Sequence, residues 1–324
     1  MHHRLPDNRP SLGLVIPAYN RKHLIGETIE SAINQNLPFT EIIVVDDGST
    51  DGTYEFLEKY SREIQIIRTT NKGVQAARNK GVAESKCEYI CLCDSDDLLE
   101  PWFVETIVEW FACPYRKDIL YSNFVTFDEH GKKSDKFSQA PQGFFAGGKS
   151  EGNFLFGIPE LYQRLITFQP LFSTGCVFSK KFYEQLGGYN TRFNRVPSED
   201  FEFALRVASL GAVSLCIRPL ARIRKHSGND SADAMKQCIG EARILAYALE
   251  AHPQAKHHKK LILESMNERR THAFDAAFAR GEFKVALELL ALLPKKPQDP
   301  KFSTKAFISR LPPPLRTLAW RMTQ

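Results

Sequence analysis

The stretch EIIVVDDGSTDGT, residues 41–53, decides the fold. Four apolar residues, Ile42–Val45, are followed at once by two aspartates, a glycine and a serine, and then by a segment with helical character. A short apolar run that ends in a polar turn before a helix is typical of a buried strand in a parallel sheet. Outward from this stretch, similar apolar runs alternate with helical patterns, which predicts βαβ units.

Periodicity predicts the following elements in the first third of the chain. Strands are expected at 12–16, 41–45, 64–68 and 89–93, and helices at 24–35, 54–60 and 74–83. Pro101 fits the first turn of one more helix. Residues 128–170 are polar and glycine-rich with little periodicity, and we expect a long functional or mobile loop there.

Regular patterns return in the second half of the chain. They predict elements at 175–178, 180–186, 199–210 and 213–217, and then helices alone at 234–249, 259–280 and 284–292. We therefore predict an α/β domain with a mainly parallel central sheet at residues 1–230 and a helical C-terminal region at 231–324.

Composition excludes several classes of protein. The chain has 324 residues, of which 43% are hydrophobic and 25% are charged, so it is neither disordered nor collagen-like. The formal net charge of +5 is concentrated after residue 294, where seven Lys or Arg face one Asp, and no basic patch elsewhere suggests a nucleic-acid partner. The seven cysteines lack paired spacing, and no stretch resembles a signal peptide or a membrane span. We expect a cytosolic protein with reduced thiols.

Four polar clusters follow the predicted strands, where ligands bind in open α/β sheets. These clusters are 17–20 (PAYN), 46–49 (DDGS), 71–73 (NKG) and 94–97 (DSDD). The turn after the first strand contains no Gly-x-Gly-x-x-Gly pattern, which disfavours a dinucleotide-dependent dehydrogenase.

A second glycine-rich pattern, GFFAGGKS at 143–150, matches the P-loop letter for letter. A working P-loop joins a buried strand to a helix, so that its amides surround phosphate. The residues before it are polar and those after it are poor helix formers. We therefore interpret it as a flexible loop rather than a phosphate loop.

The acids Asp94, Asp96 and Asp97 repel one another unless a cation or solvent relieves them. Carboxylates suit Mg²⁺ or Mn²⁺, which commonly take one or two protein ligands together with substrate phosphates. The alternative is that Asp96 or Asp97 caps the helix near Pro101. Composition alone leaves both interpretations open.

Glu199 and Asp200 begin a predicted helix, with Ser198 available as its N-cap. Acids in a first helical turn complement the helix dipole, which is a purely structural explanation. The functional alternative makes Asp200 a general base that takes a proton from an attacking hydroxyl. Spacing alone does not decide between them.

Six segments, in this order, carry a resemblance to a known family. They are LVIPAYN (14–20), IIVVDDGSTDGT (42–53), NKGVQAARNKG (71–81), CDSDDLLEP (93–101), LGGYN (186–190) and SEDFEFALRVASLG (198–211). Together they resemble the inverting family 2 glycosyltransferases of GT-A fold, of the bacterial polysaccharide or cell-envelope type. The resemblance covers residues 10 to 226 and implies a Rossmann-like nucleotide-binding sheet.

The resemblance also implies residue roles. Asp200 matches the catalytic base, with Glu199 beside it, and Asp47 or, alternatively, Asp46 would accept a ring N–H of the nucleotide base. Arg78 would lie near the nucleotide or, as the alternative, pair on the surface. The implied nucleotide-sugar site is Pro17, Tyr19, Asn20, Asp46, Asp47, Lys72, Arg78, Asp94 and Ser95. The implied Mn²⁺ or Mg²⁺ ligands are Asp96, Asp94, Asp97 and His226, and the alternative for His226 is a purely structural role.

The implied activity is transfer of a sugar, hexosyl or N-acetylhexosaminyl, from a nucleoside diphosphate sugar to a glycan or lipid-linked glycan. A UDP-sugar is the expected donor. A sugar nucleotidyltransferase is the enzymatic alternative, but it would need a glycine-rich pyrophosphate loop that residues 16–20 lack. A catalytically inert sugar-nucleotide-binding or scaffolding member is the non-enzymatic alternative.

The segment 301–324 mixes large apolar residues with five cations and contains no acid. Such a segment can lie on the anionic inner face of a cell membrane as a peripheral contact. Pro312–Pro314 would divide it into two short helical pieces. The alternative is that the tail packs on its own domain, and the sequence leaves both open.

Overall fold

The computed structural model describes residues 9–226, 233–294 and 298–323. The described chain forms two compact units. Unit 1 is built from the residues up to Arg195 together with Phe203–His226, and unit 2 from Val196–Glu202 together with the helices after residue 232. The boundary expected at residue 230 lies outside the described residues, so that division into domains stays a prediction.

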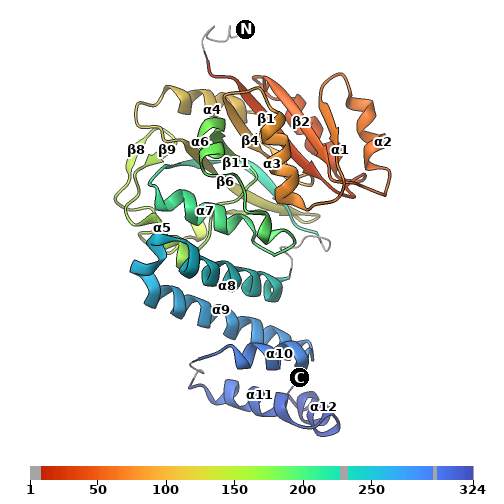
Figure 1. Cartoon of the computed structure of the whole chain (residues 1–324), viewed down its shortest axis with the longest axis vertical. Coiled ribbons are helices and arrows are strands. Elements are labelled where there is room, and N and C mark those ends of the chain that lie inside the picture. Colours follow the sequence, from red (N-terminus) through yellow and green to blue (C-terminus); the bar gives the residue numbers. More distant parts are fainter. Residues whose placement is uncertain (1–8, 227–232, 295–297, 324) are drawn as a thin grey trace. The chain divides into compact units, whose positions relative to one another are not determined.

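Unit 1 contains one mixed sheet (Figure 1). Its strands are β1 (Leu12–Ala18), β2 (Glu41–Asp46), β3 (Gln65–Arg68), β4 (Tyr89–Leu92), β5 (Leu98–Leu99), β6 (Ile119–Asp128), β7 (Gly131–Asp135), β8 (Lys149–Glu151), β9 (Phe154–Phe156), β10 (Cys176–Ser179) and β11 (Val213–Arg224). The strand order is β3-β2-β1-β4-β10-β6-β11-β9-β8, with β5 on β11 and β7 on β6. Strands β3, β2, β1 and β4 are parallel, as are β6 and β11, whereas β10 is antiparallel to both neighbours.

Seven α-helices accompany these strands in the described residues. They are α1 (Ile25–Ile33), α2 (Thr53–Leu57), α3 (Val74–Glu84), α4 (Phe103–Ala112), α5 (Leu161–Thr167), α6 (Lys180–Gln185) and α7 (Asp200–Ser209). Short 3-10 turns occur at Glu58–Tyr60, Phe137–Gln139 and Thr191–Phe193. The order of elements confirms the predicted βαβ pattern of the first third, with each boundary moved by no more than a few residues.

Helices cover both faces of the parallel strands. Leu14 and Ile16 of β1 belong to the apolar core that also contains Ile29 of α1 and Trp110 of α4. The intervening Val15 faces α3, whose Gly81 lies against it. Burial on both faces explains why these strands read as continuous apolar runs rather than as alternating patterns. All seven cysteines have free thiols.

The expectation of one long loop at 128–170 was wrong. The segment contains β7, β8, β9 and α5, with a hairpin between β8 and β9. These elements are short, and the residues of β7 and β8 are mostly exposed and polar, so they carry little apolar periodicity. The sequence pattern missed these elements because they are short, not because the segment lacks regular structure.

Two other boundaries differ from the prediction. The strand expected at 213–217 continues to Arg224, because register shifts around Pro219 let β11 bulge and resume its pairing with β6. The helix expected to include Pro101 begins instead at Phe103, with Trp102 as its N-cap. Pro101 lies in the preceding turn, where its carbonyl accepts the amide of Asn36.

Unit 2 is helical. Its helices are α8 (Ala234–Ala251), α9 (Lys259–Ala279), α10 (Phe283–Ala291), α11 (Pro300–Arg310) and α12 (Pro313–Arg321), with a 3-10 turn at Pro253–His258. The first three agree with prediction within a few residues. Phe274, Phe302 and Leu290 share a core formed by α8, α9, α10 and α11. The described tail therefore packs on its own unit through α11.

Packing between α3 and the sheet predicts an effect of Gly81→Ala. A Cβ at Gly81 would lie 2.4 Å from Cγ1 of Val15 and 3.1 Å from Cγ2 of Val45. Overpacking of this kind costs about 1–3 kcal/mol of the free energy of unfolding. Urea titration measures it.

The matched control is Gly26→Ala in α1, where the nearest atom, Cζ of Phe56, would be 3.2 Å away at the end of a side chain. Here the higher helix propensity of alanine, up to about 1 kcal/mol, opposes the mild crowding. Equal destabilisation by the two substitutions would contradict the close packing of α3 on β1.

Candidate active site

The loops after β1 and β2 lie side by side because the parallel register pairs Ala18 with Asp46. Asn20 links them: its amide donates to Oγ of Ser49 at 2.9 Å, and its Oδ1 accepts the amide of Thr50 at 2.8 Å. Tyr19 is 44% exposed between these contacts. The first two polar clusters thus form one surface with an available aromatic ring, while Pro17 is buried beneath it.

Asp47 holds the turn that follows β3. Its carboxylate accepts the Thr69 hydroxyl at 3.1 Å, the Lys72 amide at 2.9 Å and the Gly73 amide at 2.7 Å. A carboxylate has about four acceptor positions, so these three donors leave about one for a ligand. Asp47 therefore has a structural role that the sequence did not predict, and it brings the third polar cluster beside the first two.

Asp46 is fully buried beside Asp47. Its Oδ1 accepts the amide of Ser49 at 3.1 Å, and its Oδ2 lies 3.6 Å from Nε of Arg68. That Oδ2 has no hydrogen-bond donor among the described residues. Of the two aspartates, Asp46 therefore retains the less satisfied oxygen.

Arg78 lies inside the protein, where only 2% of its side chain is exposed. Its Nη2 is 2.6 Å from Oδ1 of Asp94, and its guanidinium lies 5.3 Å from the ring centre of Tyr189. A buried guanidinium needs a paired anion, because an uncompensated charge in the interior is very costly. The surface-pairing alternative for Arg78 is therefore wrong, and α3 is linked to the end of β4.

Thr174, in the turn before β10, connects two of the acids. Its hydroxyl donates to Oδ2 of Asp97 at 2.6 Å and accepts the amide of Asp94 at 3.0 Å. The other oxygen of Asp97 accepts the amide of Arg224 at 3.0 Å. Neither Asp96 nor Asp97 caps α4, whose N-cap is Trp102, so the capping alternative is wrong.

Burial raises the pKa of Asp97 well above its usual range, and the charges of Asp96 and Asp94 add to this effect. The hydrogen bonds from Thr174 and Arg224 oppose it. Asp97 is 4% exposed and has two strong partners in the protein. Its position favours support of the cluster over direct contact with a ligand.

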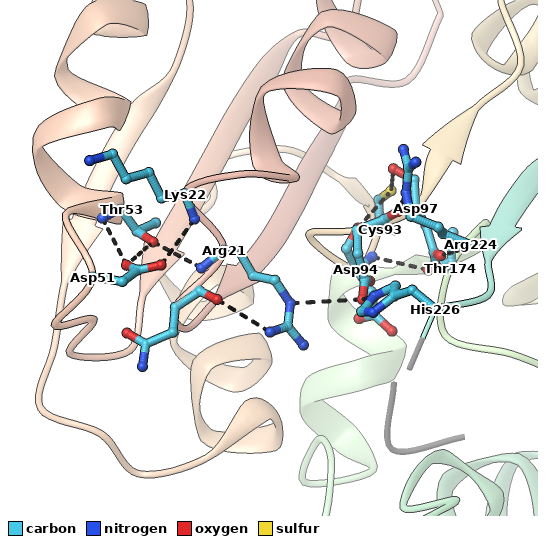
Figure 2. Close-up of polar contacts among 12 residues, drawn as sticks. Arg21, Lys22, Asp51, Thr53, Cys93, Asp94, Asp97, Thr174, Arg224 and His226 are labelled. Atoms are coloured by element: carbon cyan, nitrogen blue, oxygen red, sulfur yellow. Dashed lines mark hydrogen bonds and ion pairs between the residues drawn. The ribbon is translucent and has the colours of Figure 1, made fainter. Parts of the chain in front are cut away.

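Asp96 lies among three basic residues. Its Oδ2 lies 3.2 Å from Nε2 of His226 and 3.7 Å from Nε of Arg21, while Nε of Arg224 donates to its carbonyl at 2.9 Å. Figure 2 shows Asp94, Asp97, Thr174, Arg224 and His226 gathered at one place, with Arg21 extending toward them from the β1–α1 loop. The structure therefore brings His226 to the acids.

The sequence motifs do not indicate three residues that the structure places beside these acids, namely Arg21, Thr174 and Arg224. Arg21 directly follows the first polar cluster, and its backbone amide is fixed by Oγ1 of Thr53 at 2.9 Å. Arg224 belongs to the basic run before His226, so adjacency in the sequence could have indicated both arginines. Thr174 has no such signal, because only the folding of β10 beside β4 brings it to Asp94.

Glu199 and Asp200 lie at the start of α7, in the part of the chain that belongs to unit 2. The helix begins at Asp200, so Ser198 is not the residue immediately before it. The same first turn of α7 contains Glu202, whose Oε1 lies 3.3 Å from Nε2 of His252 with both side chains buried. Phe201 is fully buried, 6.0 Å from the guanidinium of Arg269.

The segment resembling a P-loop has the wrong polarity for phosphate. Nη1 of Arg164 donates to the carbonyls of Gly143, Phe144 and Ala146, at 3.1, 2.6 and 2.9 Å. Carbonyls rather than amides converge here, and the loop leads into β8 rather than a helix. The prediction that this segment is not a phosphate loop is confirmed, whereas its flexibility stays a prediction.

Residues 14–187 match the family model described as Glycosyl transferase family 2, which is more than half of the chain. The chain belongs to this family. Glycosyltransferase GlyA of Streptococcus pneumoniae is 26% identical to it over 319 residues, covering 89% of this chain and 42% of GlyA. The chain spans about half the length of the curated relatives it matches.

Two solved structures are similar to this family 2 chain. TarS from S. aureus, in complex with UDP-GlcNAc, has a TM-score of 0.61 and 18% identity, covering 96% of this chain and 87% of TarS. The mannosyltransferase PcManGT from Pyrobaculum calidifontis, in complex with GDP-Man and Mn²⁺, has a TM-score of 0.53 and 18% identity. The match covers 98% of this chain and 87% of PcManGT. These likenesses confirm the predicted α/β fold of GT-A type.

The side chains around Asp96 include oxygen and nitrogen donors suited to a divalent cation. Among the described residues, no three His, Cys, Asp or Glu side chains converge as a closed metal site. Asp96 and His226 nevertheless present Oδ2 and Nε2 to one another at 3.2 Å, and Mg²⁺ or Mn²⁺ commonly takes only one or two protein ligands beside phosphate oxygens. The donor set fits a cation shared with a diphosphate.

The Thr174 contacts predict that Thr174→Val lowers the free energy of unfolding by about 1–3 kcal/mol, because the buried Asp97 carboxyl and the part-buried Asp94 amide each lose a partner. Thr174→Ser keeps the hydroxyl and serves as the matched control. Urea titration of both variants measures the difference. Equal stability of the valine and serine variants would contradict the bridging role of this hydroxyl.

Proposed function

We propose that this chain is an inverting glycosyltransferase that moves a sugar from a nucleoside diphosphate sugar to an acceptor hydroxyl. The observation that carries the proposal is the arrangement around Asp94 and Asp96 in a family 2 chain. Arg78 pairs with Asp94 at 2.6 Å, and His226 lies 3.2 Å from Asp96, at the end of a parallel strand. This is where open α/β sheets bind ligands.

The nucleotide would lie over the loops after β1 and β2. Tyr19 offers an exposed ring on which a base can stack, and Asp46 or Asp47 would accept its ring N–H. Uracil has one such N–H between two carbonyls, which suits a single carboxylate acceptor, so we propose a UDP-sugar. The other proposed contacts are Pro17, Asn20, Lys72, Arg78, Asp94 and Ser95.

The diphosphate would lie beside Asp96 and His226. A bound Mg²⁺ or Mn²⁺ would offset the negative charge that develops on the departing nucleoside diphosphate. Asp96 and His226 would hold that cation, with Asp94 and Asp97 in support. Arg21, whose Nε is 3.7 Å from Asp96, would orient the carboxylate and add positive charge near the phosphates.

Asp200, with Glu199 beside it, would act on the acceptor. Its carboxylate would accept the proton of the acceptor hydroxyl as the oxygen attacks the anomeric carbon. Attack opposite to the leaving group inverts the anomeric configuration, so no covalent glycosyl-enzyme is needed. We propose a hexosyl or N-acetylhexosaminyl transfer to a cell-surface glycan or a lipid-linked glycan, by a cytoplasmic enzyme.

Substitution of the proposed base tests the mechanism. Asp200→Asn should lower turnover by about 100-fold or more, the usual contribution of a general base, while leaving nucleotide affinity close to normal. Release of nucleoside diphosphate during transfer measures the rate. Asp118→Asn, the same change at an exposed aspartate of unit 1, is the matched control. Undiminished turnover in the Asp200 variant would refute the assignment.

Substitution of Asp96 tests the cation site. Loss of even an outer-shell partner costs about 10–100-fold in metal affinity, so Asp96→Ala should weaken Mn²⁺-dependent UDP binding by at least that factor. Titration calorimetry of UDP with and without Mn²⁺ separates the metal-dependent part, and Asp118→Ala is the control. An unchanged difference between the two titrations would remove Asp96 from the site.

A further inference from the structure

The last helix of the described chain has one face attached to unit 2 and one face open. On the attached face, Nε1 of Trp320 donates to the carbonyl of Phe278 at 2.8 Å, and the Trp320 ring lies 6.0 Å from that of Phe283. Arg316 lies over the same Phe283 ring at 4.6 Å. Residues 316 and 320 are one helical turn apart, so this face of α12 is already packed.

Three large apolar side chains lie on the opposite side of α12, two in the helix and one at its C-cap, Met322. Leu315 is 56% exposed, Leu318 is 63% exposed and Met322 is 83% exposed. Their spacing of three and four residues places them along one stripe, which we call the α12 patch. Because the attached face is occupied by Trp320 and Arg316, packing within unit 2 does not account for this stripe.

Cations surround the α12 patch in the sequence. Arg321 is exposed on α12, and Arg310 is exposed at the end of α11, where Phe307 is 64% exposed. No acid occurs between residues 301 and 324. An exposed apolar stripe with cations and no acids matches an anionic lipid surface, where apolar side chains enter the acyl boundary and arginines contact headgroups.

We infer that α12 docks the protein reversibly on an anionic bilayer. The charge pattern argues against a second copy as the occupant, because a two-fold interface formed by segment 301–324 would bring the cations of both copies together, and this segment contains no acid. None of the helices in the described residues is long and apolar enough to cross a membrane. The contact is therefore interfacial, and three apolar side chains with a few cations make it weak and sensitive to salt.

This inference extends the proposed function to the place where the acceptor would be met, but its test does not depend on catalysis. The full chain is floated with vesicles of phosphatidylcholine alone and with vesicles in which a quarter of the lipid is phosphatidylglycerol. We expect binding to the anionic vesicles, little binding to the neutral ones, and release at high salt. Equal behaviour toward both vesicles would overturn the inference.

Two matched double substitutions locate the surface. Leu315→Asp with Leu318→Asp should lower vesicle binding by about tenfold or more, because two apolar anchors become charges of the wrong sign. Leu263→Asp with Leu292→Asp changes two exposed leucines elsewhere in unit 2 and adds the same charge, so it should lower binding much less. Equal losses in the two variants would contradict docking through α12.

A third variant distinguishes a loss of membrane binding from a folding defect in the leucine variants. Arg310→Gln with Arg321→Gln should lower binding to anionic vesicles about fivefold per arginine and leave thermal unfolding unchanged. Unchanged vesicle binding in this variant would overturn the proposal. A concentration-dependent dimer in sedimentation that Leu315→Asp with Leu318→Asp abolishes would identify a second copy as the occupant instead.

Discussion

Arg78 keeps its charge where its side chain is only 2% exposed, and the carboxylate of Asp94 lies 2.6 Å from its guanidinium. The buried guanidinium would be strongly destabilising there without this anion, since an isolated charge in the interior is very costly. The pair therefore fixes the middle of α3 against the end of β4. The close packing of Gly81 on Val15, one turn farther along α3, holds the same helix to the sheet.

The three acids after β4 avoid mutual repulsion by having different partners. Asp94 forms an ion pair with Arg78, and Asp97 is buried with Thr174 and the Arg224 amide, where its pKa is raised. Asp96 lies between a histidine and Arg21 at longer distances. The acid with the loosest contacts is thus the one best able to exchange a partner for a ligand.

Local patterns predicted the parallel strands, because apolar runs such as 42–45 are long enough to stand out and end in recognisable turns. They failed at β7 and β8, whose few exposed residues carry little apolar signal, and at the second half of β11, which follows register shifts around Pro219. Within the site, the acids and His226 were visible as motifs. The contact of Thr174 with Asp97 joins residues 77 positions apart, so only the strand order brings them together.

The segment 196–202, which carries Asp200, depends on helices that lie outside the family match. Its neighbours include Gly240, where a Cβ would lie 2.1 Å from the carbonyl oxygen of Pro197, and Glu241, His252 and Arg269. A chain shortened after residue 226 would retain Asp94, Asp96 and His226 but lose these neighbours. Exchange of the helical unit between relatives would consequently alter the support of the proposed base while leaving the residues around Asp96 unchanged.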